Sequence, residues 1–147
     1  MCLIVDNDVA HRVFLKPDDP DFKYVFGCLF GKRLPAASIV YGGKLKTEYL
    51  GNTALIAPLL ELRRVGRARI VDDGLIKQEI SVVTKSGLCG SNDFHIIALA
   101  RIAKVGLLCS LDKALADDFT NPALITNPRG KVYKYASHRK LLPQFCP

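Results

Sequence analysis

The order of apolar and helix-like segments is the feature that most constrains how this chain can fold. Short continuous apolar runs, typical of parallel strands covered on both faces, alternate with longer segments whose apolar residues recur at helical spacing. We expect strands at 3–5, 37–43, 106–112 and 122–128, and helices at 21–34, 44–66, 91–106 and 113–119. This alternation predicts an α/β fold, a single three-layer domain over residues 1–147 with a central, mostly parallel sheet flanked by helices.

Individual residues predict some of the boundaries. Ser91 is expected to cap the helix that it begins, and Gly106 to end it. The longest expected helix should break near Gly51 and again around Pro58. Two stretches are ambiguous: 67–74, a poor strand or a turn, and 74–87, a helix or a strand.

Carboxylates follow several of these elements on the side where parallel strands end. Asp6 comes directly after the first apolar run, and Asp112 ends the third. Glu48 lies in the helix after the second run, and Asp93 begins the helix that feeds the third. Because ligand sites of parallel sheets lie beyond the carboxyl ends of the strands, we expect these four acids at one edge. Three further acids are expected to assist them: Asp8, Asp117 and Asp118.

Such a cluster suits a hard metal ion. Neighbouring carboxylates raise one another's pKa unless a cation lies among them. Aspartates with few histidines or thiols favour Mg²⁺ or Mn²⁺, and Asp6, Asp93 and Asp112 are the expected ligands. An ion held in this way can lower the pKa of a bound water and orient it for attack on phosphorus.

Each acid also has a structural explanation. Asp93 could be a capping charge, and Glu48 could be one of the many exposed helical glutamates. Asp6 and Asp112 are harder to explain in this way, because each ends an apolar run at a strand's carboxyl edge. The two histidines next to candidate acids are expected to be structural or supporting side chains: His11 and His95.

The formal net charge is +7, and the cations are clustered. Four arginines lie between residues 63 and 69, and the C-terminal segment 129–147 carries cations but no acid. Basic clusters attract phosphate backbones, so we expect nucleic acid as a partner. Within the C-terminal segment the expected contacts are Lys131, Lys134 and Arg139.

Two tyrosines, Tyr133 and Tyr135, are interleaved with these lysines. Aromatic rings among cations suit stacking on single-stranded bases. The alternative is an edge strand whose lysines only discourage aggregation.

Composition limits the cellular setting that we expect. No apolar run reaches the roughly 18 residues that a membrane span needs. The first residues lack the basic region and long apolar stretch of a signal peptide, so we expect a cytoplasmic protein with no membrane partner. The five cysteines are scattered, with no CxxC pair, and are expected to be reduced structural thiols.

The order of the acidic motifs resembles that of the PIN-domain family, which includes the VapC toxins of toxin–antitoxin pairs. The resemblance covers most of the chain, and Asp8 stands where the family usually has Asn. The matching stretches are "LIVDND" with Asp6, "IVYGGKLKTEYL" with Glu48, "SNDFHIIALA" with Asp93, and "LLCSLDKAL" with Ser110 and Asp112.

This resemblance implies a PIN-like domain that hydrolyses RNA phosphodiesters as an endoribonuclease, with Mg²⁺ or Mn²⁺ as cofactor. It implies catalytic roles for Asp6, Glu48, Asp93 and Asp112, with Ser110 orienting a carboxylate or a water. It also implies a homodimer, and an antitoxin protein as a further partner.

Two other functions are compatible with the same residues. Haloacid-dehalogenase-like phosphatases also open with a strand and Asp-x-Asp, and there Asp6 would be the nucleophile. A catalytically silent PIN-like module would instead bind RNA or protein without cleaving it.

Overall fold

The computed structural model describes residues 1–147 and contains one five-stranded sheet. Its strands are β1 (Leu3–Val5), β2 (Ile39–Gly42), β3 (Ala68–Val71), β4 (Leu107–Cys109) and β5 (Lys131–Tyr133). They lie in the order β3-β2-β1-β4-β5, and every neighbouring pair is parallel. The predicted α/β class is therefore confirmed, with a sheet that is entirely parallel.

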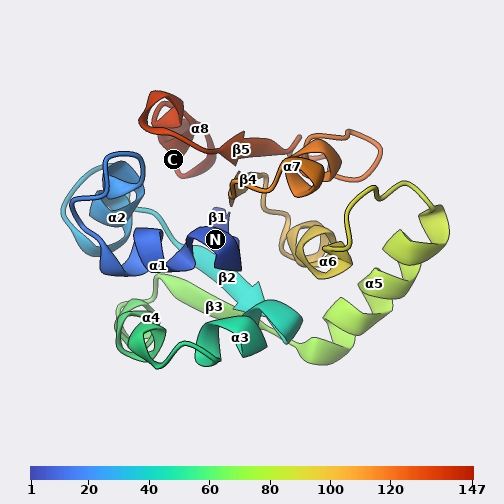
Figure 1. Ribbon diagram of the computed structural model, residues 1–147, viewed down its shortest axis with the longest axis horizontal. Helices are drawn as coiled ribbons and strands as arrows, with labels where there is room; N and C mark the ends of the chain where they lie inside the picture. The colour runs from blue at the N-terminus through green and yellow to red at the C-terminus, as the bar shows by residue number, and fades with distance from the viewer.

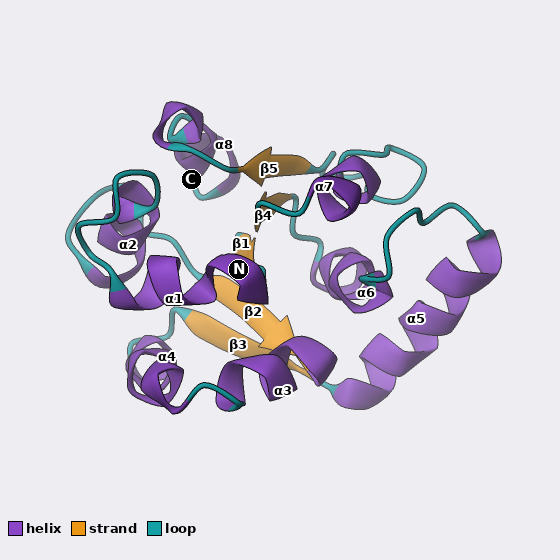
Figure 2. Ribbon diagram, in the orientation of Figure 1, coloured by secondary structure: helices purple, strands orange, loops and turns teal.

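Helices connect the strands and cover both faces of the sheet. The α-helices are α1 (Asn7–Leu15), α2 (Lys23–Phe30), α3 (Gly43–Leu50), α4 (Ile56–Arg64), α5 (Asp73–Ser86), α6 (Phe94–Ala103), α7 (Lys113–Phe119) and α8 (Leu141–Phe145). Two short 3₁₀ helices are η1 (Thr53–Leu55) and η2 (Ala136–His138). In Figure 1, α1, α2 and α4 lie on one side of the sheet, and α5, α6 and α7 lie on the other. Figure 2 shows the strands in orange running through the middle of this three-layer arrangement.

The apolar run Leu3–Val5 forms the centre of the core. All three side chains are fully buried, as expected of a central parallel strand with helices on both faces. Leu3 pairs with Leu107 and Val5 with Cys109, so β1 and β4 end side by side. The residues that follow these two strands therefore emerge next to each other.

The ambiguous stretches have definite structures. Residues 68–71 form a regular edge strand, and residues 73–86 form the helix α5. Asp72 caps α5 by accepting the Leu75 N–H at 3.2 Å, and Gly87 ends it in the left-handed conformation that glycine adopts without strain. The α6 helix differs from the prediction at both ends. Asp93 rather than Ser91 is its N-cap residue, and Lys104 rather than Gly106 adopts the left-handed conformation at its end.

The break expected around Pro58 is replaced by a helix start. Pro58 lies in the first turn of α4, where its missing N–H removes no intrahelical bond. The break near Gly51 is confirmed, since α3 ends at Leu50 and η1 follows.

The strand predicted at 122–128 is wrong. These residues form turns between α7 and β5, and two prolines within them cannot donate to a sheet ladder. The last strand lies instead in the basic segment, at Lys131–Tyr133.

The prediction that all cysteines are reduced is also wrong. Cys2 and Cys146 form a disulfide between residues 144 positions apart, whereas Cys28, Cys89 and Cys109 are free. The fold brings the start of β1 and the end of α8 together, with 5.3 Å between the two Cα atoms. Sequence spacing gives no sign of this meeting of the two ends.

Candidate active site at the carboxyl edge of the sheet

The centre of the site is the pair formed by Asp6 and Ser110, which follow β1 and β4. Asp6 is 9% exposed, and Ser110 is fully buried. The Ser110 hydroxyl donates to Asp6 Oδ2 at 2.8 Å and accepts the Asp112 N–H at 3.1 Å. Ser110 thus fixes the orientation of the Asp6 carboxylate.

Asp8 and Asp112 lie beside this pair, and each makes one backbone hydrogen bond. Asp8 Oδ2 accepts the Leu111 N–H at 3.1 Å, which joins the start of α1 to the loop after β4. Asp112 Oδ1 accepts the Leu115 N–H at 3.0 Å and caps α7. Both residues are exposed, and each uses one carboxylate oxygen for its backbone hydrogen bond.

Asp93 precedes α6 but does not cap it through its side chain. The hydroxyl of Ser91 accepts the Asp93 N–H at 3.3 Å, while the half-buried Asp93 carboxylate makes no hydrogen bond within the protein. Asp93 is therefore the N-cap residue of α6 by position, but its side chain makes no capping hydrogen bond. Its carboxylate remains available to a ligand.

The carboxylates influence one another electrostatically. Burial, followed by the charge of Asp8, raises the pKa of Asp6 to about 7. Burial and the charge of Asp112 raise the pKa of Asp93 above its usual value. The pKa of Glu48 is raised as well, mainly by burial. The structure therefore brings together four predicted acids from α3, α6 and the ends of β1 and β4.

His95, on α6, faces Glu48. Its Nε2 atom lies 3.3 Å from Glu48 Oε1, and it is the one buried side-chain nitrogen or oxygen without a hydrogen-bond partner. Burial lowers the pKa of His95 to about 4, so its imidazole is neutral near pH 7. The expectation of a supporting histidine is consistent with this place, yet the atom nearest to Glu48 is unsatisfied.

Lys44 is a residue of the site that the sequence reasoning missed. It lies on α3 four residues before Glu48, and its positive charge offsets part of the rise that burial causes in the pKa of Glu48 and of Asp93. The spacing of four residues, which places both side chains on one helix face, was a signal available in the sequence.

The two predicted auxiliaries on α7 have other roles. Asp117 is exposed and pairs with Lys113 at 3.0 Å. Asp118 is buried, and its carboxylate accepts the N–H groups of Gly90 and Ser91 and the Ser91 hydroxyl. Asp118 thereby anchors the loop before α6 and positions Asp93 indirectly.

These residues fit a metal ion in their chemistry but not in their spacing. No group of three or more His, Cys, Asp or Glu side chains is close enough together to hold an ion. The donor chemistry suits a hard cation, because Asp6 and Asp93 are carboxylates whose pKa is raised by burial and by like-charged neighbours. The acids are gathered at one edge without forming a closed ligand shell.

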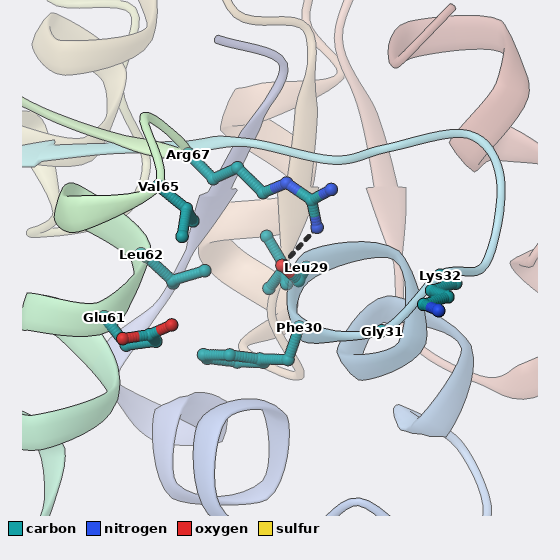
Figure 3. A pocket seen from close by; sticks show the side chains of 8 residues that line it. All are labelled: Leu29, Phe30, Gly31, Lys32, Glu61, Leu62, Val65 and Arg67. Atoms are coloured by element: carbon teal, nitrogen blue, oxygen red, sulfur yellow. Dashed lines mark hydrogen bonds between the residues drawn. The ribbon is translucent and has the colours of Figure 1, made fainter.

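Two cavities flank the sheet at different places. One of about 380 Å³ adjoins the candidate site and is lined by Asn7, His11, Glu48 and Asn52, among others. A second, of about 510 Å³, lies between α2 and α4, where Arg67 donates to the Leu29 carbonyl at 2.7 Å (Figure 3). That second cavity contains none of the predicted site residues.

The C-terminal segment behaves partly as an edge strand. Tyr133 is fully buried and donates to the Asp21 carbonyl at 2.5 Å, so its ring cannot stack on a base. Tyr135 is 51% exposed and packs on His138, with 5.3 Å between ring centroids. Lys131 is exposed, and Lys134 follows β5 at the same edge of the sheet as Ser110.

No helix of the structure is long and apolar enough to cross a membrane. Comparisons with protein-family models, with curated proteins and with solved structures found no match to this chain.

Proposed function

We propose that this protein is a Mg²⁺- or Mn²⁺-dependent endoribonuclease whose active site consists of Asp6, Glu48, Asp93 and Asp112. The observation that carries the proposal is the environment of Asp6, a buried carboxylate with like-charged neighbours and a single hydroxyl donor. A carboxylate in such a place is costly unless it serves a ligand or a reaction. The net charge of +7 favours a polyanionic substrate.

The chain's own residues supply most of the mechanism. Asp6, Asp93 and Asp112 are the proposed ligands of the metal ion, and because no three acids are close enough together to hold an ion in this structure, they would have to draw together on binding it. The bound ion would neutralise negative charge and activate a water. Ser110 holds Asp6 in one orientation. Glu48, with its raised pKa, accepts a proton from water at its exposed edge, and Lys44 attracts the phosphate.

Cleavage of single-stranded RNA, measured with Mn²⁺ or Mg²⁺, tests this proposal. Asp6→Asn and Asp93→Asn should each lower the rate by at least about 100-fold. Asp18→Asn, which neutralises an exposed aspartate outside the site, is the matched control and should keep the wild-type rate. Undiminished cleavage by both site variants would sink the assignment.

Two further measurements separate the alternatives. Mn²⁺ at about 100 times its Kd should stabilise the wild type by about 2.7 kcal/mol, whereas a silent module gains nothing. Trapping of a phospho-aspartate analogue at Asp6 by beryllofluoride would favour a phosphatase instead.

The proposal extends to the form that the resemblance implies, a homodimeric toxin controlled by an antitoxin protein. Light scattering on the purified protein measures its mass and tests the dimer. Growth arrest on expression, relieved by a small adjacent reading frame, tests the antitoxin.

A further inference from the structure

Three cations surround the ring of Tyr24 on α2. The guanidinium carbons of Arg33 and Arg139 lie 4.8 Å and 5.2 Å from the ring centroid, and Lys23 Nζ lies 5.5 Å from it. Lys23 and Tyr24 belong to α2, Arg33 follows that helix, and Arg139 lies between η2 and α8. Segments distant in sequence thus place their positive charges around one aromatic ring.

None of these three cations is neutralised within the protein. No carboxylate lies within 4.0 Å of Lys23, Arg33 or Arg139. Asp21, which precedes α2, is occupied by Arg12 and by the Ala136 N–H. The contrast with the paired Arg12 indicates that the cations around Tyr24 are free for an external anion.

The surroundings provide a shaped surface beside these charges. A cavity of about 210 Å³ opens between α2 and α8, and its wall includes Leu34, Pro35 and Leu142. Leu34 is 84% exposed. The Cys2–Cys146 disulfide fastens the end of α8 to the start of β1, which holds this wall in place. α2 and α8 lie at the same end of the molecule in Figure 1.

The Arg139 end of this seam lies close to the carboxyl end of β5, because His138 Nδ1 accepts the Lys134 N–H at 3.0 Å. Arg139 directly follows His138, whose ring packs on Tyr135 just beyond the carboxyl end of β5. Lys134 lies at that same edge, one strand away from Ser110. An extended chain leaving the carboxylates would meet Lys134 and Arg139 first, and then Arg33, which lies in the connection to the start of β2.

We propose that the α2–α8 seam, defined by Lys23, Tyr24, Arg33 and Arg139, binds the backbone of single-stranded RNA beyond the cleavage site. A guanidinium stacked on Tyr24 keeps its in-plane N–H groups free to bond phosphate oxygens. The apolar wall at Leu34 and Pro35 offers a surface for an unpaired base. An acidic protein would use the charges alone, whereas RNA uses both the charges and the apolar wall.

This inference rests on the proposed function only in taking RNA as the substrate, and binding can be measured without cleavage. The probe is a labelled single-stranded RNA of about 12 nucleotides, in EDTA, between about 50 and 200 mM salt. Replacing Lys23, Arg33 and Arg139 together by alanine should flatten the slope of log K against log salt by ~0.7 per lost contact, about 2 in total. Arg33→Gln alone, which removes one charge from an exposed side chain, should flatten the slope by ~0.7.

The matched control replaces Lys77, Lys85 and Lys104, three exposed cations that form no ion pair. It removes the same charge and should leave the slope unchanged. Equal flattening in the control, or an unchanged slope in both seam variants, would overturn the inference. A loss of polyglutamate binding with an unchanged RNA slope would also overturn it, in favour of an acidic protein. Flattening without any cleavage by the wild type would support the seam and refute only the nuclease.

Discussion

Two equally buried aspartates show what separates a structural acid from a candidate catalytic one. Asp19, in the loop before α2, is 8% exposed, and Asp6 is 9% exposed. Burial opposes ionisation of Asp19, yet hydrogen bonds from Arg12 and from two backbone N–H groups bring its pKa below the usual value. Asp6 has one hydroxyl donor and like-charged neighbours, and its pKa rises to about 7.

The partners therefore decide the state of each carboxylate, and burial alone does not. Arg12 bonds both oxygens of Asp19, at 2.8 Å and 3.1 Å, and Asp21 and Phe22 donate their N–H groups to it. This arrangement leaves nothing for a ligand to satisfy. The carboxyl edge of the sheet is the opposite case, because its acids are gathered without cations of their own apart from Lys44.

The largest expected effect is on stability, when the hydrogen-bonded pair of Arg12 and Asp19 is broken. Arg12→Ala leaves Asp19 buried and without its cation, which should cost about 3–5 kcal/mol of unfolding free energy. Urea denaturation at pH 7 measures it. Arg64→Ala, which removes an exposed pair with Glu61, is the control and should cost less than about 1 kcal/mol. Equal losses in the two variants would contradict the assigned role of Arg12.

The pH dependence of stability sharpens the comparison. The pKa of Asp6 is higher in the folded protein than in the unfolded chain, so the folded state binds more protons between about pH 4 and 7. In EDTA, Asp6 should lower the free energy of unfolding by roughly 2 kcal/mol as the pH rises from about 5 to 7. Asp19 acts in the opposite sense, because its pKa is lower in the folded protein than in the unfolded chain. The ionised Asp19 therefore stabilises the fold at pH values above the pKa of the unfolded chain, and this stabilisation is lost as acid protonates the carboxylate.

Asp6→Asn is the variant that isolates this effect. It should remove the loss of stability between about pH 5 and 7 and leave the acid limb, to which Asp19 contributes, unchanged. A wild-type stability that does not fall over this interval, or a fall that survives in Asp6→Asn, would show that Asp6 titrates normally.

Substitutions of His95 test whether the acids at the carboxyl edge of the sheet are functional. His95→Leu should lower kcat by about 10-fold with little change in KM, because the Glu48 carboxylate then faces an apolar side chain instead of the imidazole nitrogen 3.3 Å away. His95→Gln, which restores a donor, should recover part of the rate. Thermal stability should hold or rise in His95→Leu, since a buried polar atom without a partner is removed. A lowered Tm with unchanged kcat would make His95 a purely structural side chain.

The smallest expected effect concerns Asp117. Because it is exposed and pairs only with Lys113, Asp117→Asn should change the cleavage rate by less than about two-fold and stability by less than about 0.5 kcal/mol. Asp118→Asn offers the contrast, because it disturbs the anchor of the loop before α6. A large loss of activity in Asp117→Asn would show that Asp117 takes part in the active site.

Much of the fold could be predicted from local patterns. The apolar run Leu3–Val5 and the run that ends at Cys109 are buried strands because continuous apolar residues need cover on both faces. Asp6 and Asp112 could be placed at one edge for the same reason, since parallel strands end together. One failure was also local: the apolar residues between the two prolines of 122–128 resemble a strand but form turns.

The sequence by itself determined the parallel α/β layers and the edge at which Asp6, Asp93, Asp112 and Glu48 meet, because periodicity and strand ends are properties of neighbouring residues. Only the tertiary structure decided which of the acids are satisfied. Asp118 is bonded by Gly90 and Ser91, and Asp19 by Arg12, through contacts that no spacing in the chain reveals. The disulfide and the cations around Tyr24 likewise bring distant segments together. The burial of His95 Nε2 without a hydrogen-bond partner also depends on these long-range contacts. Partners of this kind depend on how the layers pack, and packing is set by the whole chain at once.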